Sequence, residues 1–306
     1  MDWLKAKRWP DGVPVCPTCG RGDATYLPDS QKWQCKSAHK SRQFSARVGT
    51  IFEDSPISLE KWLVALWMVC NCKNGISSYE IQRTVGVTQK TAWFMLHRIR
   101  LAMQSGSLMK LGGNGSPVEM DETFIGGKVK NMHKDRKPKP VANRTTRLSG
   151  IAGKTIVVGM LERNGRVRAE VVMDRTQETL HALANKHLVS TSTLITDEWG
   201  GYKGTDFEHE VINHANEYVN GLVHTNGIEN FWSLLKRGLN GTYVSVEPFH
   251  LFRYIDEQAF RYNNRGGKKR DNRITDVQRF DLALTGVVGK RLTFAEVTGK
   301  VGETSF

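Results

Sequence analysis

Apolar residues recur at helical spacing between Val223 and Arg237. The stripe consists of Ile228, Phe231, Trp232 and Leu235, and it predicts a helix that starts after Gly227. Glu229 and Lys236 stand beside this stripe, two helical turns apart on nearly the same face. A carboxylate and a cation placed in this way could bind a metal ion and hold a phosphate. An ordinary amphipathic helix has the same pattern, so this stretch alone does not identify a site.

A second helical pattern covers residues 58–104 and is interrupted by turn signals. Ser77 or Ser78 with Glu80 is typical of a helix N-cap, and Gly86 marks a turn before the next helix. A helix, a glycine-containing turn and a further helix have the spacing of a helix-turn-helix. The second helix would present four residues to DNA, namely Gln89, Lys90, Arg98 and Arg100. The alternative is a plain three-helix support domain.

Strand patterns appear after residue 117. Alternating or β-branched runs predict strands over residues 118–125, 155–161, 167–173 and 193–197, with a further candidate over 210–214. Asn164-Gly165 is a strong hairpin signal between the second and third of these runs. Residues 176–189 have the pattern of an amphipathic helix. The order of elements predicts a mixed α/β domain with acidic residues at strand ends.

The segments between these patterns are rich in glycine or in basic residues. Residues 111–117 form a glycine-rich linker, and residues 128–154 hold nine Lys or Arg against one acid. We expect this basic insertion to contact phosphates, through residues such as Lys134, Arg136 and Lys137, although a solvated loop is the alternative. Residues 248–264 have a helical stripe, and residues 265–273 are again basic. Residues 274–306 predict little beyond a short helix and a strand.

Composition narrows the class of partner. The 306 residues carry a formal net charge of +13, which favours binding to polyanions, with double-stranded DNA or RNA as candidates. No apolar run reaches the roughly 18 residues that a membrane span needs, and no secretion signal opens the chain. We therefore expect a protein without a membrane partner, located in the cytoplasm in association with the nucleoid.

Cysteine spacing predicts a zinc ribbon near the start of the chain. Cys16 and Cys19 have the C-x2-C spacing of a metal knuckle, and Cys35 follows at the distance expected for the second ligand pair. Ala38 occupies the place of a fourth cysteine, so His39 is the natural fourth ligand of a Cys3His zinc site. Another fourth group, or a small domain without metal, is the alternative.

Other sequence features bear on the ribbon and its cysteines. Tyr26 and Trp33 fit a short hairpin between the ligand pairs. Cys70 and Cys72 lie in an apolar-rich segment and are predicted to be buried helical thiols.

Three carboxylates in the second half of the chain form an ordered set. Asp121 lies on the first predicted strand, Asp197 ends a later strand, and Glu229 lies on the helix described above. Metal-assisted phosphoryl transfer needs two or three carboxylates converging on one or two divalent ions. Two acids from neighbouring strands and one from a crossing helix form the arrangement of an RNase H-like catalytic domain. Each acid alone is weak evidence, because capping and turn acids are common.

Short motifs spread over nearly the whole chain together resemble one known family. They are Cys16-Pro-Thr-Cys19 with Phe44-Ser45 and Gly49-Thr50-Ile51-Phe52, Met120-Asp121-Glu122-Thr123, Thr196-Asp197, His224-Thr-Asn226-Gly-Ile-Glu229-Asn-Phe-Trp232 with Lys236-Arg237, Gly241-Thr242-Tyr243, and Phe260-Arg261-Tyr262-Asn263. The chain resembles the DDE transposases of bacterial insertion sequences, in the group that places a zinc ribbon and a helix-turn-helix ahead of an RNase H-like domain.

This resemblance implies a site and a reaction. Asp121, Asp197 and Glu229 would bind two Mg2+ (or Mn2+) ions, while Lys236 would contact a phosphate and Arg237 would contact DNA. Water would cut the 3' strand at each element end, and the freed 3'-hydroxyl would then attack target DNA. The partners would be terminal inverted repeats and target DNA, with a homodimer or higher oligomer pairing the two ends.

Two departures from the family pattern leave alternatives open. Ala38 breaks the second C-x2-C of the ribbon. Because some relatives use an amide at the third catalytic position, Asn226 and Asn230 compete with Glu229. His214 and His224 lie close by in the sequence and would either position DNA or water or serve a structural role.

The expected fold class is a multidomain α+β or α/β chain. We expect a zinc ribbon over residues 1–50, a helix-turn-helix domain over 51–110, an RNase H-like catalytic domain over 117–273 with the basic insertion 128–154, and a C-terminal extension over 274–306. An RNase H-like nuclease or resolvase without strand transfer, or a non-catalytic DNA-binding regulator, is the alternative function.

Overall fold

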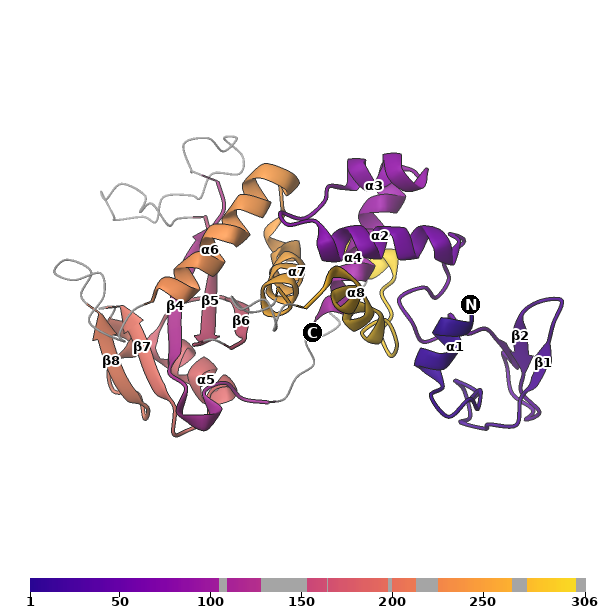
Figure 1. The fold of residues 1–306 in the computed structure, drawn as a ribbon, viewed down its shortest axis with the longest axis horizontal. Coiled ribbons are helices and arrows are strands. Elements are labelled where there is room, and N and C mark those ends of the chain that lie inside the picture. Colours follow the sequence, from indigo (N-terminus) through magenta and orange to yellow (C-terminus); the bar gives the residue numbers. More distant parts are fainter. Residues whose placement is uncertain are drawn as a thin grey trace. The chain divides into compact units, whose positions relative to one another are not determined.

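The computed structural model describes residues 1–104, 109–127, 153–163, 165–197, 200–212, 225–265 and 274–300. The chain divides into two compact units (Figure 1). Unit 1 contains residues 1–104 together with residues 271–306, and unit 2 contains residues 105–270. None of the described helices is long and apolar enough to cross a membrane.

Unit 1 begins with a small antiparallel sheet. Its elements are α1 (Asp2–Arg8), β1 (Thr25–Leu27), β2 (Lys32–Gln34) and β3 (Gln43–Phe44), with strand order β1-β2-β3. Tyr26 pairs with Trp33 and Trp33 pairs with Phe44, so the predicted hairpin is confirmed. Trp9 packs edge-on against Trp33, with ring centroids 4.8 Å apart. Aromatic packing thus supplies the core of a sheet with few residues to bury.

Three helices follow in unit 1. They are α2 (Leu59–Asn71), α3 (Ser78–Val85) and α4 (Gln89–Met103). Ser77 accepts a hydrogen bond from the backbone of Glu80, whose side chain bonds back to the Ser77 backbone. Gly86 ends α3 in the left-handed conformation with φ 62°, and Thr88 caps α4. The predicted cap, glycine turn and second helix are therefore confirmed. Cys70 is buried in α2 as predicted, whereas Cys72 lies half-buried at the C-cap.

The C-terminal segment returns to this helical part. Helices α8 (Asp276–Thr285) and α9 (Phe294–Val297) pack against α2 and α4. Val288 bridges Thr50, and the rings of Phe94 and Phe294 lie 5.6 Å apart. A Cβ on Gly286 would lie 2.0 Å from the Ala102 carbonyl oxygen, so the backbones touch there. The described part of the expected C-terminal extension is thus part of the core of unit 1.

Unit 2 is built on a mixed five-stranded sheet with the order β6-β5-β4-β7-β8. The strands are β4 (Val118–Ile125), β5 (Thr155–Glu162), β6 (Val167–Val172), β7 (Thr193–Asp197) and β8 (Glu208–Ile212), and the helices are α5 (Gln177–His187), α6 (Asn226–Gly238) and α7 (Leu251–Asn263). Strand β5 is antiparallel to both β4 and β6, whereas β7 runs parallel to both β4 and β8. Short helical segments complete the unit, namely the 3-10 helices η1 (Gly113–Gly115), η4 (Gly200–Tyr202) and η6 (Pro248–His250) and the π-helical segment η5 (Leu239–Tyr243). This topology is consistent with the expected RNase H-like domain.

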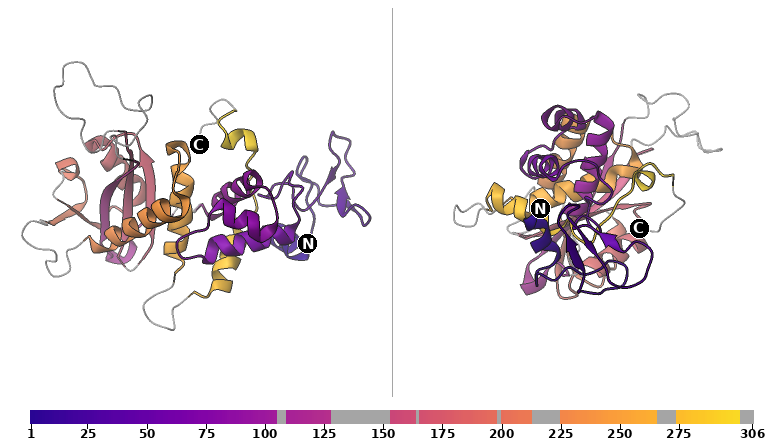
Figure 2. Two further views of the ribbon diagram at one scale, coloured as in Figure 1. Left: turned by 90° about the horizontal axis from the view of Figure 1, so that it is seen from above. Right: turned by 90° about the vertical axis from the view of Figure 1, so that its right-hand side faces the viewer.

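The sheet of unit 2 carries a separate core on each face. One core includes Leu180 of α5 with Met120 and Leu194 of the sheet. The other includes residues of α6 and α7 with Val157 and Leu161 of β5. Figure 2 shows α6 and α7 beside the sheet, in the orange part of the chain. Because side chains alternate along a strand, each residue of β4 can be assigned to the α5 face or to the α6 face.

Candidate functional sites

Asp121 and Asp197 lie on the same face of the unit 2 sheet. Strands β4 and β7 are parallel, with Val118 opposite Leu194. Extending this register by three residues brings Asp121 level with Asp197. Asp121 also pairs with Gly159 of β5, which lies under α6. Both carboxylates therefore belong to the α6 face of two adjacent central strands.

The carboxylate of Asp121 is held by one hydrogen bond on each oxygen. The indole Nε1 of Trp232 donates to Oδ2 over 2.9 Å, and the backbone N–H of Glu122 donates to Oδ1 over 2.8 Å. A Cβ on Gly159 would lie 2.6 Å from the Trp232 ring, so the indole reaches Asp121 only because position 159 has no side chain. Each carboxylate oxygen has a further lone pair that a cation could use.

Asp121 lies in an environment that disfavours its negative charge. Burial raises its pKa to about 7, the charges of Glu122 and Asp197 act in the same direction, and the Trp232 hydrogen bond opposes them. The influence of Asp197 also shows that the two aspartates are close enough to interact. A divalent cation between them would offset this repulsion, and carboxylate oxygens are the ligands that Mg2+ prefers.

Glu229 and Lys236 lie on the side of α6 that carries Trp232. Seven residues separate them, so they point about 20° apart around the helix. Trp232 lies between them along the helix axis and points about 40° to 60° to one side of them. The hydroxyl of Thr225 donates to Oε1 of Glu229 over 3.2 Å. Both Glu229 and Lys236 are exposed, and the helix turns them toward the side on which Trp232 meets Asp121.

The two competing asparagines project elsewhere. Asn226 lies at the first position of α6 and is exposed. Asn230 accepts a hydrogen bond from Arg265 over 3.3 Å. At 3.6 residues per turn, both point more than 100° away from Trp232 around the helix. The geometry therefore favours Glu229 over either asparagine.

Two further acids of β4 were not identified from the sequence. Glu119 is buried and accepts a hydrogen bond from the backbone N–H of Ile228 over 2.9 Å. Glu122 lies on the α5 face, where the Tyr202 hydroxyl donates to it over 2.6 Å and Arg175 lies 3.5 Å away. Burial raises the pKa of Glu122, the Tyr202 hydrogen bond opposes this, and the charge of Asp197 adds to it. The sequence offered one signal for Glu119, which stands two residues before Asp121 and therefore on the same face of the predicted strand.

The zinc ligands expected from the sequence come together in unit 1. The ligand atoms of Cys16, Cys19, Cys35 and His39 all lie within 4.8 Å of one another. Cys16 Sγ lies 3.5 Å from His39 Nε2, and the sulfurs of Cys19 and Cys35 are also 3.5 Å apart. The other ring nitrogen of His39, Nδ1, is 2.9 Å from the carbonyl oxygen of Lys40, which orients Nε2 toward the sulfurs. Three thiols and one imidazole suggest a structural zinc.

The backbone of the knuckle is suited to thiolates. Gly20 has φ 76° and donates its N–H to the carbonyl of Cys16 over 2.9 Å. A hydrogen bond from the Arg21 backbone to the sulfur lowers the pKa of Cys19 to about 6, with burial opposing it. Within the described residues, the acids of unit 2 do not gather as closely as the atoms of this Cys3His group.

The first turn of α4 carries the accessible part of the expected DNA-reading surface. Lys90 is exposed, with Nζ 4.6 Å from the centroid of the Phe294 ring. Gln89 is half-buried and donates to the Ser78 hydroxyl over 2.9 Å, which ties α4 to α3.

The expectation that Arg98 and Arg100 face DNA is wrong. Arg98 is 4% exposed and Arg100 is fully buried. The Arg98 guanidinium donates to three carbonyl groups, those of Ile51, Glu53 and Leu292. It therefore ties the segment before α2 and the returning C-terminal segment to α4. The loss of solvent around Arg98 lowers its pKa.

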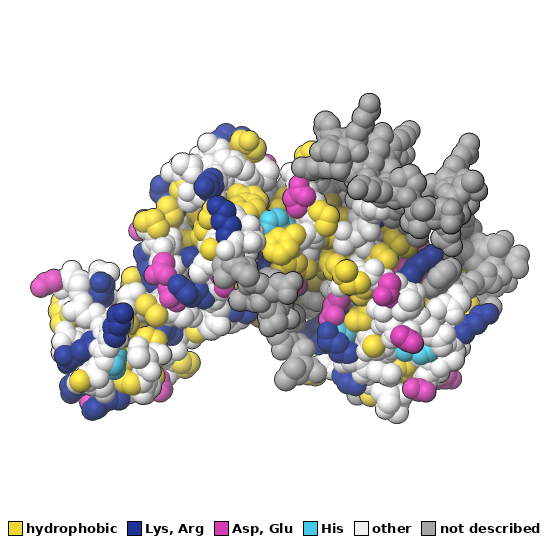
Figure 3. Space-filling view, turned by 180° about the vertical axis from the view of Figure 1, so that it is seen from behind, with side chains coloured by type: hydrophobic (Ala, Val, Ile, Leu, Met, Phe, Trp, Pro, Cys, Tyr) yellow, Lys and Arg dark blue, Asp and Glu magenta, His cyan; other side chains and the backbone are white. Residues whose placement is uncertain are grey.

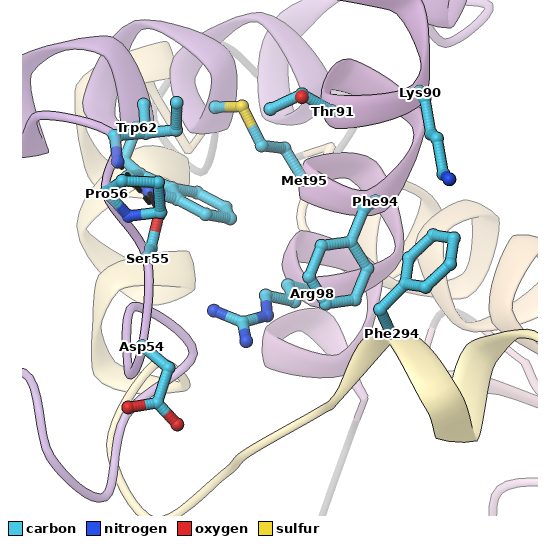
Figure 4. A pocket seen from close by; sticks show the side chains of 11 residues that line it. Asp54, Ser55, Pro56, Trp62, Lys90, Thr91, Phe94, Met95, Arg98 and Phe294 are labelled. Carbon is cyan, nitrogen blue, oxygen red and sulfur yellow. Dashed lines mark hydrogen bonds between the residues drawn. The ribbon is translucent and has the colours of Figure 1, made fainter.

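Arg98 borders a pocket of about 380 Å³ in unit 1. Figure 4 shows its guanidinium directed into the pocket, with Phe94 and Phe294 on one side and Trp62 on the other. Lys90 stands at the end of the pocket formed by the first turn of α4.

The structure describes only some of the remaining basic residues. Arg237 is exposed on α6, next to Lys236. Lys134, Arg136 and Lys137, with most of the basic insertion, lie outside the described residues, as do His214 and His224. Lys and Arg side chains also gather on the ribbon part of unit 1 (Figure 3).

Two proteins are similar in sequence to this chain. An uncharacterized protein in transposable element ISH50 of Halobacterium salinarum is 27% identical over 244 residues, covering 76% of this chain and 80% of the relative. An uncharacterized transposase-like protein of Haemophilus influenzae is 29% identical over 102 residues, covering 32% of this chain and 82% of the relative.

Two family descriptions match separate parts of the chain. A transposase zinc-ribbon domain matches residues 1–41, which include all four ligands of the Cys3His group. An ISXO2-like transposase domain matches residues 110–263, which include β4, β7 and α6. Because the second match spans just over half of the chain, this protein belongs to the family of ISXO2-like transposases.

Proposed function

We propose that the protein is a DNA transposase that cleaves the ends of an insertion sequence and joins the freed 3'-hydroxyl to target DNA. The observation that carries this proposal is the alignment of Asp121 and Asp197 on adjacent strands, beneath the α6 side that carries Glu229 and Lys236. Both reactions are in-line displacements at phosphorus, so one set of groups can serve both.

In this proposal Asp121, Asp197 and Glu229 hold two Mg2+ or Mn2+ ions. All three offer carboxylate oxygens. Burial, and to a smaller extent the charges of Glu122 and Asp197, raise the pKa of Asp121, and bound cations would favour its charged form. When bound, the ions would activate the attacking hydroxyl and stabilise the leaving oxygen. The chain's own part is to orient the carboxylates: Trp232 fixes Asp121, and Thr225 holds Glu229.

Basic groups would position the DNA. Lys236 is exposed in the last turn of α6, on the side that carries Trp232, where it can contact a phosphate near the acids. Arg237 is also exposed but points about 140° away from Trp232 around the helix, so it would contact a more distant part of the DNA. The first turn of α4, with Gln89 and Lys90, is the proposed reader of the terminal repeat. The insertion that holds Lys134 is a further proposed phosphate contact. Pairing two element ends requires at least a homodimer.

The first test replaces Asp121 with Asn, which keeps the size of the side chain and removes its charge. We expect Asp121→Asn to abolish both end cleavage and strand transfer, by at least a thousand-fold. The assay uses plasmid DNA carrying the terminal repeats that flank the coding region, in Mg2+ and in Mn2+. Glu170→Gln, on the edge strand β6, is the matched control and should keep full activity.

The products of this assay decide between reaction types. Strand transfer by Asp121→Asn would refute the acid assignment. A wild-type protein that nicks the ends but never joins them to plasmid DNA would instead be a nuclease or resolvase.

The zinc ribbon predicts about one zinc per chain in metal analysis of the purified protein. Cys16→Ser should lose this zinc, because three of the four ligands are thiolates in a closed site. Cys72→Ser, at the end of α2, is the control and should keep it. Full zinc content with unchanged affinity in His39→Ala would exclude His39 as the fourth ligand.

DNA binding through the first turn of α4 predicts that Lys90→Ala weakens binding to terminal-repeat duplexes. The slope of log affinity against log salt concentration should fall by about one, because one phosphate contact is lost. Lys186→Ala is the control, since Lys186 is also exposed but pairs with Glu170 on the α5 side. Equal salt slopes for wild type and Lys90→Ala would place the DNA elsewhere.

Metal binding should depend on pH through Asp121. Because Asp121 must lose its proton to bind a cation and its pKa is about 7, Mn2+ affinity should be about tenfold lower at pH 6 than at pH 8. The stability of the metal-free protein should depend on pH in the opposite direction to Mn2+ affinity, so it should fall as pH rises. The folded pKa lies above the ordinary 3.8, so protonated Asp121 favours folding at low pH, and this contribution is lost as pH rises from about 4 through 7.

Trp232→Phe is the matched variant for this pH profile. It keeps an aromatic ring over Gly159 but removes the N–H that favours the charged form of Asp121. The midpoint of Mn2+ binding should therefore move to higher pH. An unchanged Mn2+ affinity between pH 6 and pH 8 in the wild type would contradict the role of Asp121.

A further inference from the structure

Glu119 is a buried carboxylate two residues before Asp121 on β4. Its residue is 1% exposed, and by strand alternation it lies on the same α6 face as Asp121. Its Oε2 accepts a hydrogen bond from the backbone N–H of Ile228 over 2.9 Å, and its Oε1 lies 3.5 Å from Arg163 Nη2. A buried carboxylate is costly unless such partners satisfy it.

This hydrogen bond replaces the usual cap of the helix. In α3, α4, α5 and α8 the N-cap side chain accepts the backbone N–H three residues later. In α6 the N-cap residue Thr225 makes no such bond, and its hydroxyl donates to Glu229. The N–H of Ile228, at the third position of α6, is instead satisfied by Glu119. A negative group at this end also complements the helix dipole.

Gly227 allows the close approach that this cap requires. A Cβ at position 227 would lie 2.7 Å from Glu119 Oε2 and 2.5 Å from Leu161 Cδ2. The Tyr262 hydroxyl donates to the Gly227 carbonyl over 3.2 Å, which holds the same turn from α7. The first turn of α6 is therefore seated directly on β4 and β5.

We propose that Glu119 is a positioning residue for the metal site, and this inference rests on the function proposed above. Two hydrogen bonds join β4 to α6 about one turn apart, from Ile228 N–H to Glu119 and from Trp232 to Asp121. Two attachment points fix both the translation and the rotation of a helix. Glu119 thereby sets where Glu229, between the two donors, meets the aspartates.

The test compares Glu119→Gln with Glu257→Gln in the full-length protein. Glu257 is equally buried in unit 2 and pairs with Arg261 and Tyr243, so the control removes the same charge from a site on α7. Mn2+ titration of the folded, DNA-free protein should show affinity about tenfold weaker for Glu119→Gln, as for other residues that orient metal ligands. Glu257→Gln should bind Mn2+ as the wild type does, whatever it does to the melting temperature.

Amide hydrogen exchange measures how firmly the first turns of α6 are held, and it needs no metal. Glu119→Gln should accelerate exchange in residues 225–232, whereas Glu257→Gln should leave that segment unchanged. Gly227→Ala, which keeps Glu119 but pushes the helix outward, should reproduce both effects. If Glu119→Gln folds poorly, Gly227→Ala decides the question.

Specific outcomes would overturn the inference. The first is that Glu119→Gln and Gly227→Ala both keep the Mn2+ affinity and the amide exchange rates of the wild type. The second is that Glu257→Gln weakens Mn2+ binding as much as Glu119→Gln does, because the effect would then come from a general loss of stability. Asp121→Asn separates this failure from failure of the proposed function. If Asp121→Asn binds Mn2+ as the wild type does, the assignment of the acid site itself is wrong. If Asp121→Asn loses Mn2+ binding but the Glu119 and Gly227 variants keep it, only the positioning role of Glu119 is refuted.

Discussion

The site of unit 2 depends on how closely α6 lies on the central strands. Two glycines set this distance, because the missing Cβ of Gly159 makes room for the indole of Trp232 and that of Gly227 makes room for the carboxylate of Glu119. A methyl group at either position would move the helix or its side chains by a few tenths of an ångström or more. Since an α-helix is stiff, such a shift would be carried to every side chain on the face that looks toward the aspartates.

The same close packing concentrates negative charge. Asp121 is half-buried beside Glu122 and near Asp197, and its pKa is raised mainly by loss of solvent and in addition by the charges of these two acids. A fold selected for stability alone would avoid this arrangement, because burying like charges costs free energy. The partners differ on the two faces of β4: Tyr202 satisfies Glu122 on the α5 face, whereas Asp121 receives the single indole N–H of Trp232 from α6. The α6 face therefore keeps acceptor capacity that a cation can use.

The sequence predicted those features that depend on neighbouring residues. The cap at Ser77 and the turn at Gly86 follow from local backbone requirements, and most strands follow from alternation. Arg98 was misassigned because its burial depends on Leu292, 194 residues away, whose segment has little periodicity of its own. Glu119 was missed for a related reason. Its partner is a backbone N–H 109 residues away, which the pattern of side chains does not predict. Pattern reasoning fails where a polar side chain is satisfied by distant backbone.

The two candidate metal sites differ in how far they depend on the rest of the fold. Cys16 and His39 are 23 residues apart, so the ribbon closes a short loop at modest entropic cost and its ligands are fixed by local turns. The hydrogen bond between Asp121 and Trp232 spans 111 residues and forms only when the sheet and α6 have both assembled. A closed thiolate site of the first kind suits a structural ion, which must stay bound. A carboxylate site of the second kind would respond to any movement of α6, so the proposed contact of DNA with Lys236 on that helix would act directly on the geometry of the acids.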